Sequence, residues 1–300
     1  MTFRKYLPRS VRLKAQEIHY KVYGCKMPWS ALRFEIHLTD KCNLNCAGCI
    51  HFSSLCGELN LLDINVYESD IKRISALTGG ICADIRILGG EPLLHPEVAG
   101  FLELTRKYFP VCASSDIFGK IELVTNGILL PKQPDRFWTV CAENNIIIVV
   151  SEYPVALEKE YIRKTARKFG VQIKLMEESC GVEMTGSANQ WVKIPLDIQG
   201  KQNYRKSFGA CFLGGICFQL VKGKIYKCAR IAYIAYFNKY FNQNLEVAED
   251  DYVDIYKAPN SAAILNELIK PARLCRYCKA RNITWDNQWK KSKKILDEYL

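Results

Sequence analysis

Three cysteines stand close together early in the chain. Cys42, Cys46 and Cys49 lie in the stretch LTDKCNLNCAGCIHF (38–52), directly after a strand-like run. Thiolates bind zinc or iron–sulfur clusters, and a structural zinc site needs four protein ligands. His51 is the candidate fourth ligand for zinc, because six residues separate the next cysteine, Cys56, from Cys49. Three thiolates on a four-iron cube would instead leave one iron open, as catalysis requires. Redox thiols or a chance grouping would give the same spacing.

A second group of cysteines lies in the C-terminal third. It comprises Cys211, Cys217, Cys228, Cys275 and Cys278. A C-x2-C pair with two distant cysteines suits a structural zinc ribbon as well as an iron–sulfur cluster. The spacing alone leaves both kinds of site open.

The interpretation of the fourteen cysteines depends on whether the protein is cytoplasmic or secreted. No apolar run approaches the roughly 20 residues that span a bilayer, and the N-terminus lacks the apolar core of a secretory signal. We therefore expect a cytoplasmic protein, in which clustered cysteines indicate metal binding or catalysis rather than disulfides. Cys82, Cys112 and Cys141 stand alone beside apolar segments and are expected to be small buried hydrophobic residues.

The chain carries a formal net charge of +11, with basic residues concentrated at both ends. The resulting positive electrostatic potential favours anionic partners. Basic residues on solvated helix faces would give the same distribution of charge along the chain. No arginine-and-aromatic ribbon or zinc-finger spacing indicates base recognition, so a nucleic-acid partner is not expected.

Strand-like and helical segments alternate between residues 33 and 177. The expected strands are 33–39, 84–90, 120–127, 145–153 and 171–177, and the expected helices are 65–77, 95–109, 134–144 and 156–169. This alternation predicts an α/β fold with a parallel sheet buried on both faces. A closed or partly closed barrel is expected, with an open doubly wound sheet as the alternative.

The polar motifs follow the ends of these strands. The cysteine loop follows the first strand, GGEP (89–92) the second, TNG (125–127) the third and SEYP (151–154) the fourth. Loops at the carboxyl ends of parallel strands face one mouth, so these four should converge on a ligand. Beyond about residue 200 the alternation stops, and QLVKGKIYKC (219–228) predicts a hairpin that turns at Gly223.

Together, the cysteine spacing and GGEP, TNG and a serine after the fourth strand resemble the radical S-adenosylmethionine superfamily. The resemblance implies a partial (β/α)6 TIM-like barrel over residues 33–205, preceded by a basic extension (1–32). It also implies that Cys42, Cys46 and Cys49 hold a [4Fe–4S] cluster that binds S-adenosylmethionine. Reductive cleavage of that molecule would give a 5′-deoxyadenosyl radical, with an electron donor such as flavodoxin or ferredoxin.

The same resemblance gives roles to the other motifs. Gly89, Gly90 and Glu91 would hold the amino group of S-adenosylmethionine, and Ser151 and Asn126 would contact its ribose or carboxylate. The residue before the third cysteine is usually aromatic in this superfamily and packs near the adenine, but here it is Gly48. Phe52 or His51 would have to take over that packing.

The C-terminal cysteines resemble a shortened SPASM module, called a twitch domain, over residues 206–300. Cys211, Cys228, Cys275 and Cys278 would then close a second, auxiliary [4Fe–4S] cluster, with Cys217 as a possible substitute for Cys211. Cys180 follows the fifth strand and could donate a hydrogen atom to a substrate radical; a bystander cysteine is the alternative.

These expectations lead to a radical oxidoreductase, lyase or epimerase. Its substrate would be a small anionic molecule, carbohydrate-like or nucleotide-linked, that undergoes dehydrogenation, dehydration or epimerisation. A maturase of a ribosomally made peptide is the first alternative, disfavoured by the short segment before the first strand. A non-catalytic iron–sulfur or zinc protein is the second, but such a protein needs neither Glu91 nor an open three-cysteine loop.

Overall fold

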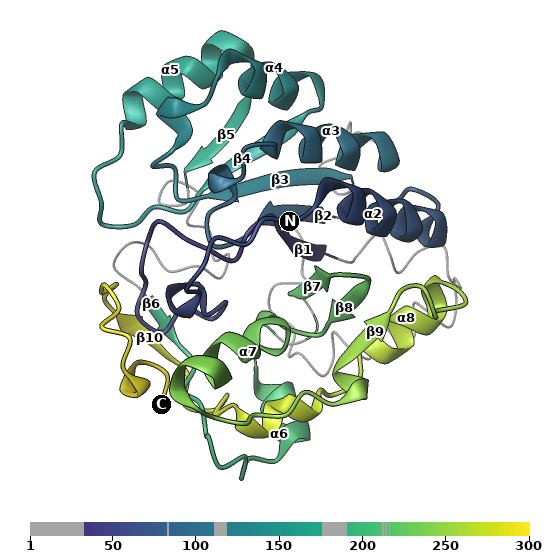
Figure 1. Ribbon diagram of the computed structural model, residues 1–300, viewed down its shortest axis with the longest axis vertical. Helices are drawn as coiled ribbons and strands as arrows, with labels where there is room; N and C mark the ends of the chain where they lie inside the picture. The colour runs from purple at the N-terminus through teal and green to yellow at the C-terminus, as the bar shows by residue number, and fades with distance from the viewer. Residues whose placement is uncertain are drawn as a thin grey trace, which may run out of the picture.

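The computed structural model describes residues 33–82, 84–110, 119–175, 191–211, 213, 215 and 217–300. Its centre is an eight-stranded sheet with the strand order β5-β4-β3-β2-β1-β7-β8-β9 (Figure 1). The first six strands in this order run parallel, and β8 and β9 are antiparallel to their neighbours. The predicted α/β fold with a mostly parallel sheet is therefore confirmed.

The alternating half of the chain forms the elements expected from its sequence. The strands are β1 (Arg33–His37), β2 (Asp84–Leu88), β3 (Lys120–Thr125), β4 (Ile146–Val150) and β5 (Gln172–Leu175). The helices are α2 (Ile64–Thr78), α3 (Val98–Tyr108), α4 (Asp135–Glu143) and α5 (Lys159–Phe169). Local signals fix their ends: Asp63 caps α2 by accepting two backbone N–H groups, and Gly79 ends it in the left-handed conformation.

The sixth parallel strand comes from the C-terminal region. β7 (Phe218–Val221) pairs with β1, and the predicted hairpin joins it to β8 (Lys224–Tyr226) through Lys222 and Gly223. Both turn residues have positive φ, as a tight hairpin turn requires. Six strands were expected before residue 205, but the structure places β7 beside β1 instead. Its pairing covers the edge of β1 that would otherwise be open.

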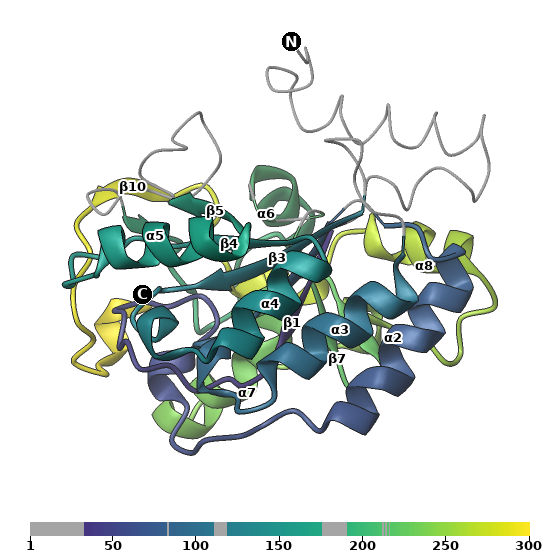
Figure 2. The ribbon, with the colours of Figure 1, turned by 90° about the horizontal axis from the view of Figure 1, so that it is seen from above.

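The remaining elements belong to the C-terminal part. They are β6 (Trp191–Lys193), α6 (Tyr204–Ala210), α7 (Ala229–Phe241), β9 (Tyr252–Asp254), α8 (Ser261–Leu268) and β10 (Thr284–Asn287), with β6 and β10 forming a separate two-stranded sheet. Short 3₁₀ helices cover Ser53–Leu55, Pro92–Leu94, Leu130–Lys132, Glu249–Asp251, Arg273–Tyr277 and Leu296–Glu298. Helices α2 to α5 lie on one side of the sheet and α6 and α7 on the other (Figures 1 and 2).

Two hydrophobic cores hold the chain together. The first packs the apolar face of the sheet against α2 to α5 and includes the two predicted buried cysteines, Cys82 and Cys141. Cys112 lies outside the described residues. The second core gathers α7, Tyr277 and Tyr299 around Phe52 from the cysteine loop. The loop is therefore attached to the sheet at one end and to the C-terminal core at the other.

The opposite face of the sheet carries charged side chains, which we call the charged face. Strand register places Glu35, Arg86 and Glu122 side by side. Arg86 lies 2.9 Å from Glu122, and Arg33 on the neighbouring row lies 2.6 Å from Asp84. Because side chains alternate along a strand, the apolar core and this charged face follow from one pattern.

The turn after β2 packs so closely on the loop after β1 that Gly89 and Gly90 have no room for a side chain. A Cβ on Gly89 would stand 2.3 Å from the Thr39 carbonyl oxygen, and one on Gly90 would stand 2.2 Å from that of Lys41. The Gly90 N–H donates to the Thr39 oxygen (2.8 Å), and the Glu91 N–H donates to the Lys41 oxygen (2.9 Å). The two glycines therefore let the turn after β2 lie directly on the cysteine loop.

We expect Gly90→Ala to lower the free energy of unfolding by about 1–3 kcal/mol, because the added methyl meets backbone rather than a movable side chain. The control is Gly209→Ala in α6, where nothing lies within 4 Å of the added Cβ. That change should stabilise the chain by about 0.5–1 kcal/mol. Denaturant unfolding of both variants checks the pair, and equal effects would contradict the close contact.

Candidate iron–sulfur and S-adenosylmethionine site

The three cysteines of the first loop each receive hydrogen bonds at sulfur. The Leu44 N–H donates to Cys42 (3.4 Å), and backbone N–H groups of the turn after Cys49 donate to that cysteine. Cys46 accepts from the indole Nε1 of Trp289 at 3.1 Å. Burial, with the nearby charges of Glu91 and Cys49, raises the pKa of Cys42 to about 12. The bare loop thus holds neutral thiols, and binding of a metal must release their protons.

The arrangement suits a cluster better than a single ion. In the described part of the chain, no three His, Cys, Asp or Glu side chains are close enough together to hold one metal ion. Yet the charges of Cys42 and Cys49 both raise the pKa of Cys46, so the thiols are neighbours. Each thiolate of a cube binds a different iron, so its sulfurs stand further apart than those around one zinc.

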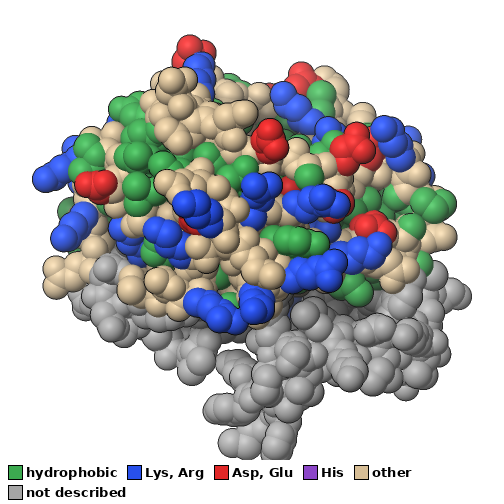
Figure 3. Space-filling model, turned by 90° about the horizontal axis from the view of Figure 1, so that it is seen from below, with side chains coloured by type: hydrophobic (Ala, Val, Ile, Leu, Met, Phe, Trp, Pro, Cys, Tyr) green, Lys and Arg blue, Asp and Glu red, His purple; other side chains and the backbone are tan. Residues whose placement is uncertain are grey.

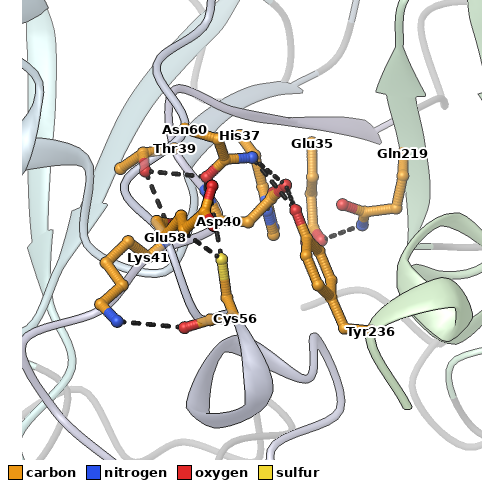
Figure 4. Close-up of polar contacts among 10 residues, drawn as sticks. All are labelled: Glu35, His37, Thr39, Asp40, Lys41, Cys56, Glu58, Asn60, Gln219 and Tyr236. Atoms are coloured by element: carbon orange, nitrogen blue, oxygen red, sulfur yellow. Dashed lines mark hydrogen bonds and ion pairs between the residues drawn. The ribbon is translucent and has the colours of Figure 1, made fainter. Parts of the chain in front are cut away.

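Both candidates for a fourth ligand are engaged elsewhere. The His51 ring packs edge-on against His37, with centroids 4.8 Å apart, and lies near Tyr233. The Cys56 thiol donates to the Glu58 carbonyl oxygen at 3.2 Å (Figure 4).

Glu91 is fully buried at the junction of two strand ends. Its carboxylate accepts hydrogen bonds from Thr125 Oγ1 (2.6 Å), Asn126 N (2.9 Å) and Leu93 N (3.1 Å). Burial raises its pKa to about 7, and these three donors oppose the shift. Both carboxylate oxygens of Glu91 thus accept hydrogen bonds from the chain itself, and these bonds join the end of β2 to the end of β3. The backbone of residues 89–91, rather than the carboxylate, faces the cysteine loop.

The other two predicted cofactor residues lie at neighbouring strand ends. Asn126 follows β3, is buried, and donates through Nδ2 to Asn43 Oδ1 at 2.7 Å; the same nitrogen lies 3.9 Å from the Cys42 sulfur. Ser151 follows β4, and its backbone N–H donates to the Thr125 carbonyl oxygen (2.8 Å). The structure thus brings Asn126 to the cysteine loop, while Ser151 lies one strand further along the sheet edge.

The C-terminal segment explains why position 48 is glycine. Gly48 has φ of +64°, and a Cβ there would stand 2.8 Å from the Glu298 carbonyl oxygen. Phe52 is 0% exposed between Phe237 and Tyr299, with centroids 5.5 Å from each ring. Its ring is enclosed by the second core and is not free to pack against an adenine, contrary to the expectation from sequence.

Two aromatic residues that the sequence analysis did not single out stand beside the loop. Tyr153 is buried, and burial together with the charges of Cys46, Cys49 and Cys42 raises its pKa well above the usual value. The Trp289 ring lies 6.2 Å from the Tyr153 ring. Tyr153 belongs to the SEYP stretch already recognised as a strand end, whereas nothing in the spacing of the sequence indicated Trp289.

The C-terminal cysteines come together in one pocket. Cys211, Cys228, Cys275 and Cys278 line it, together with Lys227 and Arg230. Cys217 is not among the lining residues; burial and the charges of Glu35 and Cys228 raise the pKa of its thiol, while Arg33 and Arg86 at the charged face lower it. Cys180 lies outside the described residues.

Two buried cations flank these four thiols. Lys227 is 1% exposed, and its Nζ has no hydrogen-bond partner within the described residues. Arg230 Nη1 lies 3.8 Å from the Cys278 sulfur, and its Nε is likewise unpartnered there. An unpaired buried cation is costly, so a negatively charged group in this pocket would satisfy both side chains. Four thiolates around an iron–sulfur cube carry such a charge.

A polar network beneath the first loop also went unrecognised in the sequence. Asp40 accepts from Tyr236 (2.6 Å) and Asn60 (2.6 Å), and His37 Nδ1 lies 2.7 Å away (Figure 4). Burial would raise the pKa of Asp40, but these partners hold it at about 2. The network ties the start of the loop to α7 and borders a cavity of about 300 Å³.

Part of the predicted basic charge lies next to the loop. Lys290, Lys291 and Lys293 are exposed, and the Lys290 carbonyl oxygen accepts from the Ala47 N–H (2.9 Å). On the face seen in Figure 3, Lys and Arg side chains are spread among Asp and Glu rather than gathered in one patch. The N-terminal basic residues lie outside the described part of the chain.

The sequence of this chain is similar to known proteins over about a third of its length. No family model matches the chain. GTP 3',8-cyclase from Chlorobaculum tepidum is 33% identical over 100 residues, which cover 33% of this chain and 27% of that protein. GTP 3',8-cyclase from Pelotomaculum thermopropionicum is 36% identical over 102 residues, 33% of this chain and 28% of the relative. The chain thus spans less than a third of the length of these curated relatives.

Solved structures give weaker likenesses. BtrN in complex with AdoMet and 2-DOIA covers 82% of this chain, and 92% of BtrN is covered, at 15% identity and a TM-score of 0.47. Native anSMEcpe with bound AdoMet covers 83% of each chain at 16% identity, with a TM-score of 0.47. These values are too low to transfer a reaction or a substrate.

Among the described helices, none combines the length and the apolar character that a membrane crossing needs.

These relatives match about a third of the chain, a local likeness that supports the expected radical S-adenosylmethionine superfamily, with a [4Fe–4S] cluster and S-adenosylmethionine as the expected cofactors.

Proposed function

We propose that this enzyme cleaves S-adenosylmethionine reductively and uses the resulting radical on a small anionic substrate, carbohydrate-like or nucleotide-linked. One observation carries the proposal: three thiols, one buried and two half-buried, share one loop, each with an N–H donor at sulfur, while the nearby His51 and Cys56 make contacts of their own. Such a loop leaves one iron of a cube open. When bound there, S-adenosylmethionine supplies the 5′-deoxyadenosyl radical that abstracts hydrogen.

The chain's own residues have distinct tasks in this proposal. Cys42, Cys46 and Cys49 hold the cluster, and Gly89 and Gly90 keep the turn after β2 against them. Glu91 is internally satisfied, so the amino group of S-adenosylmethionine would meet the backbone of this turn rather than the carboxylate. Asn126 and Ser151 stand at the next strand ends, where the ribose or carboxylate would be held.

The charged face supports the substrate class. Arg33 and Arg86 are paired with buried carboxylates, and Lys174 lies 3.6 Å from Glu122. Alternating cations and carboxylates offer both anion contacts and acceptors for hydroxyl groups. The relatives' name states GTP, an anionic nucleotide, as their substrate, which agrees with this class. Dehydrogenation, dehydration and epimerisation all remain within the proposal.

The C-terminal pocket would hold the auxiliary [4Fe–4S] cluster. Its four thiols close the coordination, so its role is electron transfer rather than substrate binding. Lys227 and Arg230 would offset the charge of the cluster. A flavodoxin or ferredoxin would supply the reducing electron.

Changing Cys42, Cys46 and Cys49 together to Ala should abolish formation of 5′-deoxyadenosine, because the cluster that binds S-adenosylmethionine loses its ligands. The assay is anaerobic reconstitution, iron and sulfide analysis, then dithionite reduction with S-adenosylmethionine. Cys56→Ala is the matched control, since that thiol binds the Glu58 carbonyl oxygen. The control should keep the product, whereas 5′-deoxyadenosine from the triple variant would refute the assignment.

The second prediction separates the candidate ligands of the auxiliary cluster. Cys275→Ala with Cys278→Ala should lower the iron content from about eight to about four per chain. Cys217→Ala should leave it unchanged, because Cys217 is not among the residues that line the pocket of the other four thiols. Metal analysis of all three proteins decides the point. Loss of zinc in place of iron would make the pocket a zinc site.

A further inference from the structure

The donors to the three loop sulfurs are of different kinds. Cys42 and Cys49 accept from backbone N–H groups of their own loop, supplemented by Asn126 Nδ2 at 3.9 Å from the Cys42 sulfur and by the Ser53 side chain at Cys49. Cys46 accepts from the indole of Trp289, 243 positions away in the sequence, at 3.1 Å. The environment of this one sulfur therefore depends on a single side chain from the end of the chain.

The segment that carries this indole is built onto the loop. We call residues 289–299 the C-terminal strap. Its Lys290 carbonyl oxygen accepts from the Ala47 N–H (2.9 Å), and its Ser292 N–H donates to the Asn45 carbonyl oxygen (2.7 Å). Cys46 and Lys291 form an antiparallel bridge between these two bonds. Hydrogen bonds on both sides of Cys46 thus fix the strap in register with the loop.

The far end of the strap is anchored as firmly. Tyr299 is 1% exposed, and its hydroxyl lies 3.0 Å from Ser54 Oγ. The Glu298 carbonyl oxygen occupies the space that a side chain at Gly48 would need. The loop is therefore shaped to receive this strap, and the strap in turn places the Trp289 ring between Cys46 and Tyr153.

We infer that Trp289 raises the reduction potential of the cluster held by Cys42, Cys46 and Cys49, by donating its indole N–H to the Cys46 sulfur. This inference rests on the proposed function. Hydrogen bonds to ligating sulfurs tune cluster potentials, because an N–H dipole stabilises the electron-rich reduced form more than the oxidised form. Trp289 acts as a positioning residue.

The test compares Trp289→Phe with the unchanged enzyme, full-length and with both sites reconstituted. Phenylalanine keeps a ring beside Tyr153 but removes the N–H donor. The readout is the midpoint potential in a redox titration followed by electron paramagnetic resonance, using the signal that changes when S-adenosylmethionine is added. We expect the potential to fall by about 59 mV, equivalent to a tenfold change in the one-electron equilibrium.

The matched control is Trp138→Phe, which makes the same change in α4. There the ring is buried in the first core, where it packs against Phe137 and Phe169. Its potential should equal that of the unchanged enzyme. An equal fall in both variants would mean that general loosening, not the N–H donor, moves the potential.

A second measurement needs no variant to fold. Enzyme grown with tryptophan labelled at the indole nitrogen with ¹⁵N should give a hyperfine coupling to the reduced, S-adenosylmethionine-responsive cluster, because Nε1 lies 3.1 Å from the Cys46 sulfur. A responsive cluster with no such coupling, or with an unchanged potential in Trp289→Phe, overturns the inference alone. Absence of any cluster that responds to S-adenosylmethionine overturns the proposed function as well.

Discussion

The close contact between the turn after β2 and the loop after β1 is the constraint on which the site depends. A Cβ atom on Gly89 would stand 2.3 Å from the Thr39 carbonyl oxygen, and one on Gly90 would stand 2.2 Å from the Lys41 carbonyl oxygen. Neither position therefore has room for a side chain. Two backbone hydrogen bonds then fix the loop on the edge of the sheet. Glu91 extends this junction to β3 by accepting from Thr125 and Asn126. These contacts fix the position of the cysteine loop.

Much of this could be predicted from the sequence because the determinants are local. The isoleucines and valines of β4 are buried on both faces, as a continuous apolar run in a parallel strand predicts. The Gly223 hairpin follows from turn chemistry, and the cysteine loop and GGEP meet because parallel strands end at one edge. In each case neighbouring residues carry the information, so periodicity and turn residues suffice.

The missed features all depend on contacts distant in sequence. Trp289 reaches Cys46 across 243 positions, and Tyr236 reaches Asp40 across 196. β7 takes the place beside β1 although no pattern in the chain states which strand pairs there. Phe52 was expected near a cofactor, but Phe237 and Tyr299, both far along the chain, enclose it. Spacing identifies a ligand loop, whereas what surrounds it is fixed only by tertiary packing.

The two cysteine sites differ in the charge of the groups that surround the thiols. The pocket of four thiols has two buried cations, Lys227 and Arg230, which would offset the net negative charge of the proposed closed cube in a poorly solvated place. Around the three-cysteine loop the contacts at sulfur are neutral N–H donors instead. A cationic sulfonium is expected to bind there, and a fixed lysine or arginine would repel it. The absence of cations from the sulfur contacts of this loop, within the described residues, therefore suits the proposed cofactor.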